Sequence, residues 1–218
     1  MPRFAANLSM QFGEVEFLDR FAAASRAGYK GVEFLFPYAF KAEELAGKLS
    51  GNGLEQVLFN MPPGNWDAGE RGLACLPDRV GEFQDGVGTA IEYAKTLNCP
   101  RLHVMAGLKP EGVDEDKIRE TYVSNLKFAA GELAKAGLML VIEAINWRDM
   151  PGFYLNYSAQ AFGILDEVGA PNLKFQYDIY HMQRMEGELA NTIAANLDRI
   201  GHMQLADTPG RHEPGTGE

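Results

Sequence analysis

Cysteine is scarce in this sequence. Cys75 and Cys99 are the only two, and they do not form a CxxC pair. So few cysteines argue against a secreted domain held together by disulfides. Residues 1–10 also lack the basic-then-apolar pattern of a secretory leader. We therefore expect a protein of the reducing cytoplasm.

The sequence also has few basic residues and no long apolar runs. Lys and Arg number 20 against 30 Asp and Glu, which gives a formal net charge of -10 at pH 7. An acidic surface opposes binding to nucleic-acid phosphates or anionic lipid. Apolar runs such as 138–142 are far shorter than the ~20 residues of a membrane helix. We expect a small-molecule substrate, with no nucleic-acid and no membrane partner, and an anionic substrate would need local cations. The oligomeric state stays open, a homo-oligomer included.

Two phosphate-binding motifs are missing from the sequence. No GxGxxG follows the first expected strand, and GxxxxGK[ST] does not occur. Both motifs hold phosphates on glycine-rich backbone at the start of a helix. Their absence argues against a dinucleotide-binding or P-loop protein.

What the sequence does contain is a regular alternation of short β-branched or aromatic runs with longer stretches of helical periodicity. The expected strands are residues 4–9, 32–36, 56–60, 101–105, 139–145, 174–178 and 201–206. The expected helices are residues 14–27, 42–50, 81–97, 115–136, 158–168 and 188–196. Repeated βα units in one domain, residues 1–218, predict a parallel sheet with right-handed crossovers.

Residues at the expected helix ends support this division. Left-handed C-cap glycines are expected where helices stop, at Gly28, Gly51, Gly137 and Gly169. Asp114 and Ser158 are expected N-caps, because their side-chain oxygens can accept the free N–H groups of a first helical turn.

Three late strands favour a closed barrel over an open sheet. With a period of two, Glu143 ends one face of its strand, Asp178 ends a face shared with Gln176, and Gln204 shares a face with His202. A barrel points alternate residues into its lumen and gathers polar groups at the carboxyl ends of its strands. The sequence therefore predicts an α/β fold of the (β/α)8 TIM-barrel type, with three polar side chains at one mouth.

Glu143, Asp178 and Gln204 offer oxygen ligands for a hard divalent metal ion such as Mg²⁺ or Mn²⁺. Each carboxylate taken alone could instead be a helix N-cap or half of a surface ion pair. Their placement on neighbouring strands of one barrel favours a metal site.

Two further residues could bind substrate. His181, on the exit from the strand 174–178, could donate a hydrogen bond to a substrate oxygen, and the alternative is a structural loop or core histidine. Arg211 could hold a carboxylate through two parallel hydrogen bonds, and the alternative is a solvated loop arginine. His103 and His202 are expected to pack in the lumen.

Six segments together resemble the hydroxypyruvate isomerase family. They are AANLSM (5–10), VEFLFPY (32–38), AGERG (68–72), IEAIN (142–146), QYDIYHMQRMEG (176–187) and EPGTGE (213–218). The resemblance runs through the whole chain and implies a xylose isomerase-like TIM barrel. It also implies that Glu143, Asp178 and Gln204 hold the metal, that Glu143 is catalytic, and that His181 and Arg211 contact substrate.

The family's sequences continue beyond GTGE into another helix and a last strand that carries a second catalytic glutamate, whereas this sequence stops at Glu218. We therefore expect a barrel that lacks its eighth strand, one metal ligand and one acid/base group.

The resemblance implies a proton transfer between adjacent carbons. In hydroxypyruvate the metal would bind the ketone and hydroxyl oxygens, a base would remove the C3 hydrogen, and return of a proton at C2 of the enediolate would give tartronate semialdehyde (2-hydroxy-3-oxopropanoate). Alternatives are a 2-oxo-tetronate isomerase, a ketose 3-epimerase or a non-catalytic truncated barrel. A DNA-repair endonuclease on the same barrel is opposed by the acidic charge and by the lack of a histidine-rich zinc set.

Overall fold

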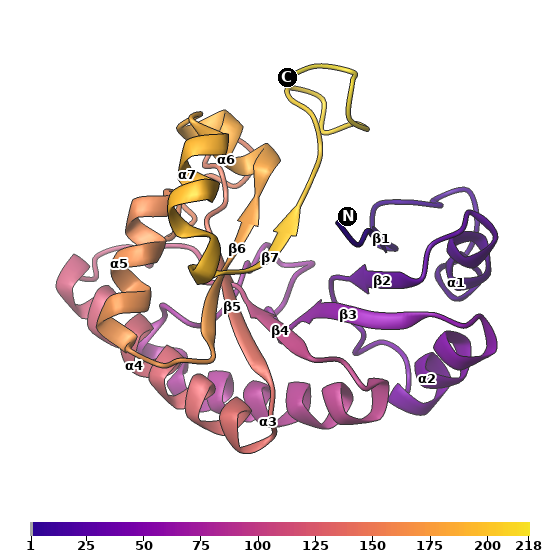
Figure 1. Cartoon of the computed structure of the whole chain (residues 1–218). Helices are drawn as coiled ribbons and strands as arrows, with labels where there is room; N and C mark the ends of the chain where they lie inside the picture. The colour runs from indigo at the N-terminus through magenta and orange to yellow at the C-terminus, as the bar shows by residue number, and fades with distance from the viewer. Residues whose placement is uncertain (1) are drawn as a thin grey trace.

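The computed structural model describes residues 2–218 and shows one curled parallel sheet with helices on its outer side (Figure 1). Each strand pairs with the next in the chain, in the order β1-β2-β3-β4-β5-β6-β7. The strands are β1 (Ala5–Asn7), β2 (Gly31–Phe34), β3 (Glu55–Asn60), β4 (Arg101–Val104), β5 (Met139–Glu143), β6 (Leu173–Asp178) and β7 (Ile200–Gln204). Met1, the first residue of the stretch 1–10 considered above for a leader, lies outside the described residues.

Helices connect successive strands along most of the chain. They are α1 (Phe17–Arg26), α2 (Ala42–Gly51), α3 (Val80–Leu97), α4 (Glu115–Lys135), α5 (Ser158–Val168), α6 (Ile179–Met185) and α7 (Leu189–Asn196), with 3-10 turns η1 (Pro77–Arg79) and η2 (Leu197–Arg199). The seven expected strands and six expected helices are therefore confirmed, and their observed ends differ from the predicted ends by up to three residues. The short helix α6 was not expected. Within the described residues, no helix is long and apolar enough to cross a bilayer.

The expected helix caps are confirmed in part. Asp114 accepts a hydrogen bond from the Asp116 N–H at 2.9 Å, as expected of an N-cap. The prediction for Ser158 is wrong, since Tyr157 is the N-cap of α5 and Ser158 is its first helical residue. Gly51 is also wrong as a C-cap, because it lies inside α2 and the left-handed residue is Gly53. The other three glycines adopt the expected positive φ: Gly28, Gly137 and Gly169.

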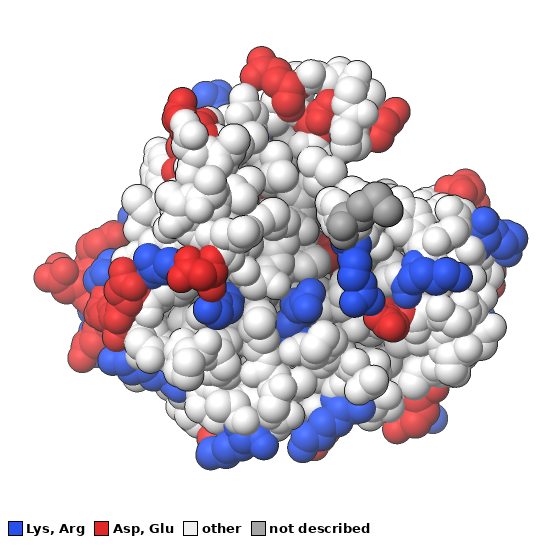
Figure 2. Space-filling model, viewed as in Figure 1, with Lys and Arg blue, Asp and Glu red and all other residues white. Residues whose placement is uncertain are grey.

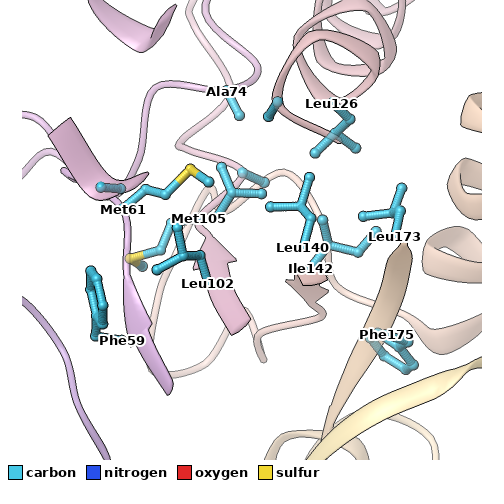
Figure 3. Packing of buried hydrophobic residues seen from close by; sticks show 14 of the residues in the cluster. Phe59, Met61, Ala74, Leu102, Met105, Leu126, Leu140, Ile142, Leu173 and Phe175 are labelled. Carbon is cyan, nitrogen blue, oxygen red and sulfur yellow. The ribbon is translucent and has the colours of Figure 1, made fainter. Parts of the chain in front are cut away.

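The main core fills the space between the sheet and the outer helices. Figure 3 shows Leu102, Leu140 and Ile142, from neighbouring strands, packed near Leu126 of α4, and all four are buried. Phe175 of β6 lies on the same side and contacts Phe162 of α5 edge to face at 5.2 Å between ring centroids. Aliphatic and aromatic burial of this kind supplies most of the folding free energy. The core leaves the alternate residues of each strand to face the lumen.

The described residues form seven strands, and β1 and β7 are the edges of the sheet (Figure 1). A cavity of about 2200 Å³ lies between these edges and extends to the carboxyl end of β6. Its lining includes polar side chains that also face the lumen: Asn7, Glu33, Asp178, His202, Gln204 and Arg211. Met203 and Leu205, which alternate with Gln204 along the edge strand β7 and its exit, are 38% and 50% exposed. The fold thus gathers polar groups along one open side of an incomplete barrel.

Candidate active site

Glu143 is the last residue of β5, and its side chain turns away from the apolar core formed by Leu140 and Ile142. It is 6% exposed. Two histidine nitrogens lie nearby: His103 Nε2 is 3.6 Å from Oε2 and His181 Nε2 is 3.7 Å from Oε1. The predicted lumen position of His103 is confirmed.

The surroundings of Glu143 disfavour its ionised form. Burial raises the pKa of Glu143 well above its usual range, and the negative charge of Asp178 raises this pKa further, while Arg211 opposes both effects. Burial likewise lowers the pKa of His103 to about 3, so its ring is neutral at pH 7. His103 therefore gives Glu143 no compensating positive charge.

Asp178, at the end of β6, serves two elements at once. One carboxylate oxygen accepts the His181 N–H at 3.2 Å and so caps α6. The other accepts a hydrogen bond from Arg211 Nη2 at 3.1 Å. The N-cap alternative considered above is therefore correct for Asp178, but it does not displace the site, because one oxygen still faces Arg211 and Glu143.

Gln204 lies beside Asp178 in the ladder between β6 and β7. Its side-chain oxygen accepts a hydrogen bond from Gln176 Nε2 at 2.9 Å, and its nitrogen donates to Glu33 Oε1 at 2.5 Å. Since a carbonyl oxygen has two lone pairs, one remains for a further partner. The structure brings Gln204 to the site, but as the link between Gln176 and Glu33.

Glu33 of β2 is the main polar residue that the sequence analysis missed as a site residue. Besides Gln204 it accepts hydrogen bonds from Asn7 Nδ2 at 3.0 Å and contacts His202 Nε2 at 2.7 Å. This contact confirms the lumen position of His202. The available signal was a lone carboxylate in the otherwise apolar strand GVEF, which is 4% exposed in the fold. A buried charge of this kind needs partners, and here it has three.

His181 follows the exit from β6 as expected, but it lies in the helix α6 and not in the expected loop. The chain turns into a helix directly after β6 because Asp178 caps the first turn. The helix carries the imidazole back over the strand ends, where Nε2 is 3.7 Å from both Glu143 Oε1 and Asp178 Oδ2. Burial lowers the pKa of His181 to about 4. The ring is therefore neutral at pH 7.

Arg211 reaches the site from the segment after β7. The Asp207 carboxylate organises this segment by accepting the N–H groups of Gly215, Thr216 and Gly217. Arg211 has a φ of 56°, an uncommon conformation for a residue with a side chain. Its guanidinium donates to Asp178 and lies 4.8 Å from the centre of the Tyr180 ring. Arg211 is thus held at the site instead of being a solvated loop residue.

The donor set fits a divalent cation. Glu143, Asp178 and His181 each offer one ligand atom, and these atoms all lie within 4.8 Å of one another. Two carboxylates this close repel each other when both are ionised, and a cation between them removes that repulsion. The buried His103 Nε2 beside them has no hydrogen-bond partner among the described residues. The two carboxylate oxygens suit Mg²⁺ or Mn²⁺ better than a thiophilic metal.

The raised pKa of Glu143 predicts a pH-dependent stability change. The folded, metal-free chain keeps this proton to higher pH than the unfolded chain, so its stability falls as pH rises through the folded pKa. The neutral amide in Glu143→Gln escapes this loss. We expect the variant to be stabilised at about pH 8 by on the order of 1 kcal/mol, or about 2–4 °C in Tm, and to match the parent near pH 4. Thermal unfolding in chelator would measure this, and an equal difference at both pH values would contradict it.

Curled parallel strands with outer helices, and carboxylates at the strand ends, define the chain as a barrel of the TIM class with a candidate metal-dependent active site. A family model described as "Xylose isomerase-like TIM barrel" matches residues 21–218. The chain therefore belongs to the xylose isomerase-like TIM barrel family.

Named relatives match along the whole chain. The hydroxypyruvate isomerase of Escherichia coli (strain K12) is 53% identical over 218 residues, which cover 100% of this chain and 84% of that protein. The 2-oxo-tetronate isomerase of Cupriavidus necator is also 53% identical, with the same coverage. A solved structure described as AP endonuclease, family 2, from Brucella melitensis has a TM-score of 0.98 at 47% identity, and covers 100% of this chain and 84% of its own. The expected fold is confirmed, and the named curated relatives are isomerases.

Proposed function

We propose that the protein is a metal-dependent isomerase that interconverts hydroxypyruvate and 2-hydroxy-3-oxopropanoate (tartronate semialdehyde). The observation that carries the proposal is the buried group of Glu143, Asp178 and His181 at the strand ends, with Arg211 beside it. This group combines a proton carrier, a cation site and a positive charge for a substrate carboxylate. Its relatives named as hydroxypyruvate and 2-oxo-tetronate isomerases, at 53% identity, support the same reaction class.

Glu143 is proposed as one of the two proton carriers of the reaction. Loss of a proton from C3 of hydroxypyruvate, gain of a proton at C2 and passage of the O3 hydroxyl proton to O2 together move the carbonyl group from C2 to C3, and Glu143 would carry one of the two carbon-bound protons. Glu143, Asp178 and Gln204 are the proposed ligands of Mg²⁺ or Mn²⁺. When bound, the cation would supply positive charge for the substrate oxygens on which negative charge develops. The same positive charge favours the ionised form of Glu143 that can accept a proton.

Arg211 and His181 are the proposed substrate contacts. The guanidinium can hold the substrate carboxylate through two parallel hydrogen bonds, which provides the local positive charge that an anionic substrate needs in a protein of net charge -10. His181 is buried, neutral at pH 7 and 3.7 Å from both carboxylates, so it is placed to donate to an oxygen of a molecule bound there.

Arg211→Lys tests the carboxylate contact. Lysine keeps the positive charge beside Asp178 but loses the planar pair of donors. Because a charge-assisted hydrogen bond contributes about 1.5–3 kcal/mol, we expect KM for hydroxypyruvate to rise about 10- to 100-fold with a smaller change in kcat. Arg148→Lys is the matched control, since Arg148 is exposed and stacks on Trp147. An unchanged KM would remove Arg211 from the substrate site.

Substrate length separates the proposal from the 2-oxo-tetronate isomerase alternative. Both reactions use the same proton transfer, and the longer acid adds one carbon that the site must accommodate. Initial rates with hydroxypyruvate and with 2-oxo-tetronate, at saturating Mg²⁺ or Mn²⁺, give kcat/KM for each. A higher value for hydroxypyruvate supports the proposal, and a higher value for the four-carbon acid assigns the chain to the alternative.

The charge of the protein disfavours an endonuclease activity, although one similar structure is described as AP endonuclease. Figure 2 shows the molecule from the same side as Figure 1. On this face Lys and Arg are interspersed with Asp and Glu, and they form no continuous basic surface for a phosphate backbone. Incision of an abasic DNA duplex by the metal-loaded protein would overturn this view.

We also propose that the protein acts in the cytoplasm. Cys75 and Cys99 are both buried and free, as suits a reducing compartment.

A further inference from the structure

Asn146, three residues past the end of β5, is fully buried and contacts His181 of the candidate site. Its side-chain Nδ2 is 2.7 Å from His181 Nδ1, and its backbone N–H points at the same nitrogen from 3.5 Å. The backbone N–H can only donate. Both contacts therefore require His181 Nδ1 to be an acceptor, which means that Nδ1 carries no proton.

The side-chain amide of Asn146 has a fixed orientation. The backbone N–H of Asp149 donates to Asn146 Oδ1 at 2.9 Å, so that position must be the oxygen. Asn146 Nδ2 in turn donates to Asp149 Oδ2 at 3.0 Å, and Tyr180 holds the same carboxylate oxygen at 2.6 Å. A flipped amide would place its nitrogen against a backbone donor and its oxygen against a carboxylate. The nitrogen therefore faces His181.

Because Nδ1 of His181 is unprotonated, the proton of the neutral ring is on Nε2. The Nε2 atom is 3.7 Å from both Glu143 Oε1 and Asp178 Oδ2, which is too far for its N–H to form a hydrogen bond to either. Arg211 Nη2 lies 3.3 Å from Nε2. If Nε2 accepted from Arg211, the Nδ1 proton would meet the Asn146 amide at 2.7 Å, and Arg211 already has an acceptor in Asp178 at 3.1 Å.

We propose that Asn146 is a positioning residue that holds His181 in the Nε2–H form, so that His181 donates a hydrogen bond to a substrate oxygen and does not ligate the metal ion. An Nε2 that carries a proton has no lone pair for a cation. The three-residue set of Glu143, Asp178 and His181 thus divides into two carboxylate ligands and one donor. The substrate contact rests on the proposed isomerase function, but the position of the proton does not.

The tautomer can be measured in the metal-free protein. Two-bond ¹H–¹⁵N spectra of protein labelled at histidine distinguish the two neutral forms, and the His181→Gln spectrum identifies the signals of His181. We expect an Nε2–H pattern in the parent protein. In Asn146→Asp a carboxylate replaces the donor, so we expect the pattern to change to Nδ1–H. An Nδ1–H pattern in the parent, or no change in Asn146→Asp, would overturn the proposal.

Asn156→Asp is the matched control. Asn156 donates to the Ile145 carbonyl at 2.7 Å in the same connection between β5 and α5 and makes no hydrogen bond to His181. It undergoes the same chemical change without touching the ring, so its spectrum should keep the Nε2–H pattern. A changed tautomer in this control would mean that general disturbance of the segment, and not the Asn146 donor, sets the proton position.

Bound Mn²⁺ provides a second measurement that does not depend on turnover. Pulsed EPR detects ¹⁴N coupling when an imidazole nitrogen ligates Mn²⁺. We expect no His181 coupling in the parent protein, and coupling in Asn146→Asp that disappears when His181→Gln is added. His181 coupling in the parent would overturn the proposal. For isomerisation we expect Asn146→Asp to lower kcat about 10- to 100-fold, the loss of activity typical when a residue that orients an active-site group is changed. If neither the parent protein nor Asn146→Asp isomerises hydroxypyruvate, the proposed function fails, but the tautomer result still stands.

Discussion

Glu143→Gln should abolish isomerisation of hydroxypyruvate and leave the fold intact. The amide is nearly the same size as the carboxylate and fits the same buried position at the end of β5. It cannot take a proton from C3 or return one at C2. A positioned acid/base group typically contributes ~10² to 10⁴ in rate, so kcat should fall by at least about 100-fold. Steady-state rates with saturating Mg²⁺ or Mn²⁺ would measure the loss.

The control for this prediction is Glu132→Gln, a change of the same kind at a residue of α4 that pairs with Lys135 at the surface. This variant should retain full activity. Far-UV circular dichroism and thermal unfolding of Glu143→Gln should show a folded protein, which would separate lost chemistry from lost structure. Turnover within a few-fold of the parent would exclude Glu143 as the proton carrier, whatever its pKa.

Asp178→Asn is expected to have the second largest effect, on metal affinity. The substitution removes one of two buried carboxylates, those of Glu143 and Asp178, whose ligand oxygens lie within 4.8 Å of each other. Loss of a residue that only orients a ligand already costs about 10- to 100-fold in metal affinity. Loss of the ligand charge itself should therefore weaken Mn²⁺ binding by more than about 100-fold. Calorimetric titration of the metal-free protein with Mn²⁺ would give both affinities.

The amide keeps an oxygen that can accept the His181 N–H, so α6 should keep its N-cap. Asp166→Asn is the matched control, because Asp166 forms an ion pair with Arg199, which directly precedes the amino end of β7. Its Mn²⁺ affinity should equal that of the parent. Parent-like binding by Asp178→Asn would place the cation elsewhere and remove the main support for a metal-dependent mechanism.

Much of the fold follows from the sequence because strand and helix periodicities differ. The alternation in KFQYD put Gln176 and Asp178 on one face and Phe175 on the other, and the structure confirms this division. Helix ends were less predictable. Gly51 fell within α2, since Gly53 provided the positive φ two residues later. A run of glycine-containing turn residues does not say which of them adopts the left-handed conformation.

The site was only partly predictable, because much of it depends on pairs of residues far apart in the chain. Each of Glu143, Asp178 and Gln204 could be placed at a strand end from its own strand. The contact of Gln204 with Glu33 joins residues 171 positions apart, and no local sequence pattern predicts it. The role of Asn146 depends on α6, which forms because Asp178 caps it and which no apolar periodicity indicated. Short capped helices of this kind are recognised by hydrogen bonds and not by sequence pattern.

The central claim is that these buried groups move a proton between adjacent carbons of a hydroxy-oxo acid with a divalent cation. The most direct measurement is incorporation of solvent deuterium when the 218-residue chain is incubated with hydroxypyruvate in D₂O, followed by NMR with Mg²⁺ or Mn²⁺ and with chelator. We predict deuterium at the reacting carbons in the presence of metal, none in chelator, and none with Glu143→Gln. A folded protein that binds Mn²⁺ and incorporates no deuterium would contradict the account.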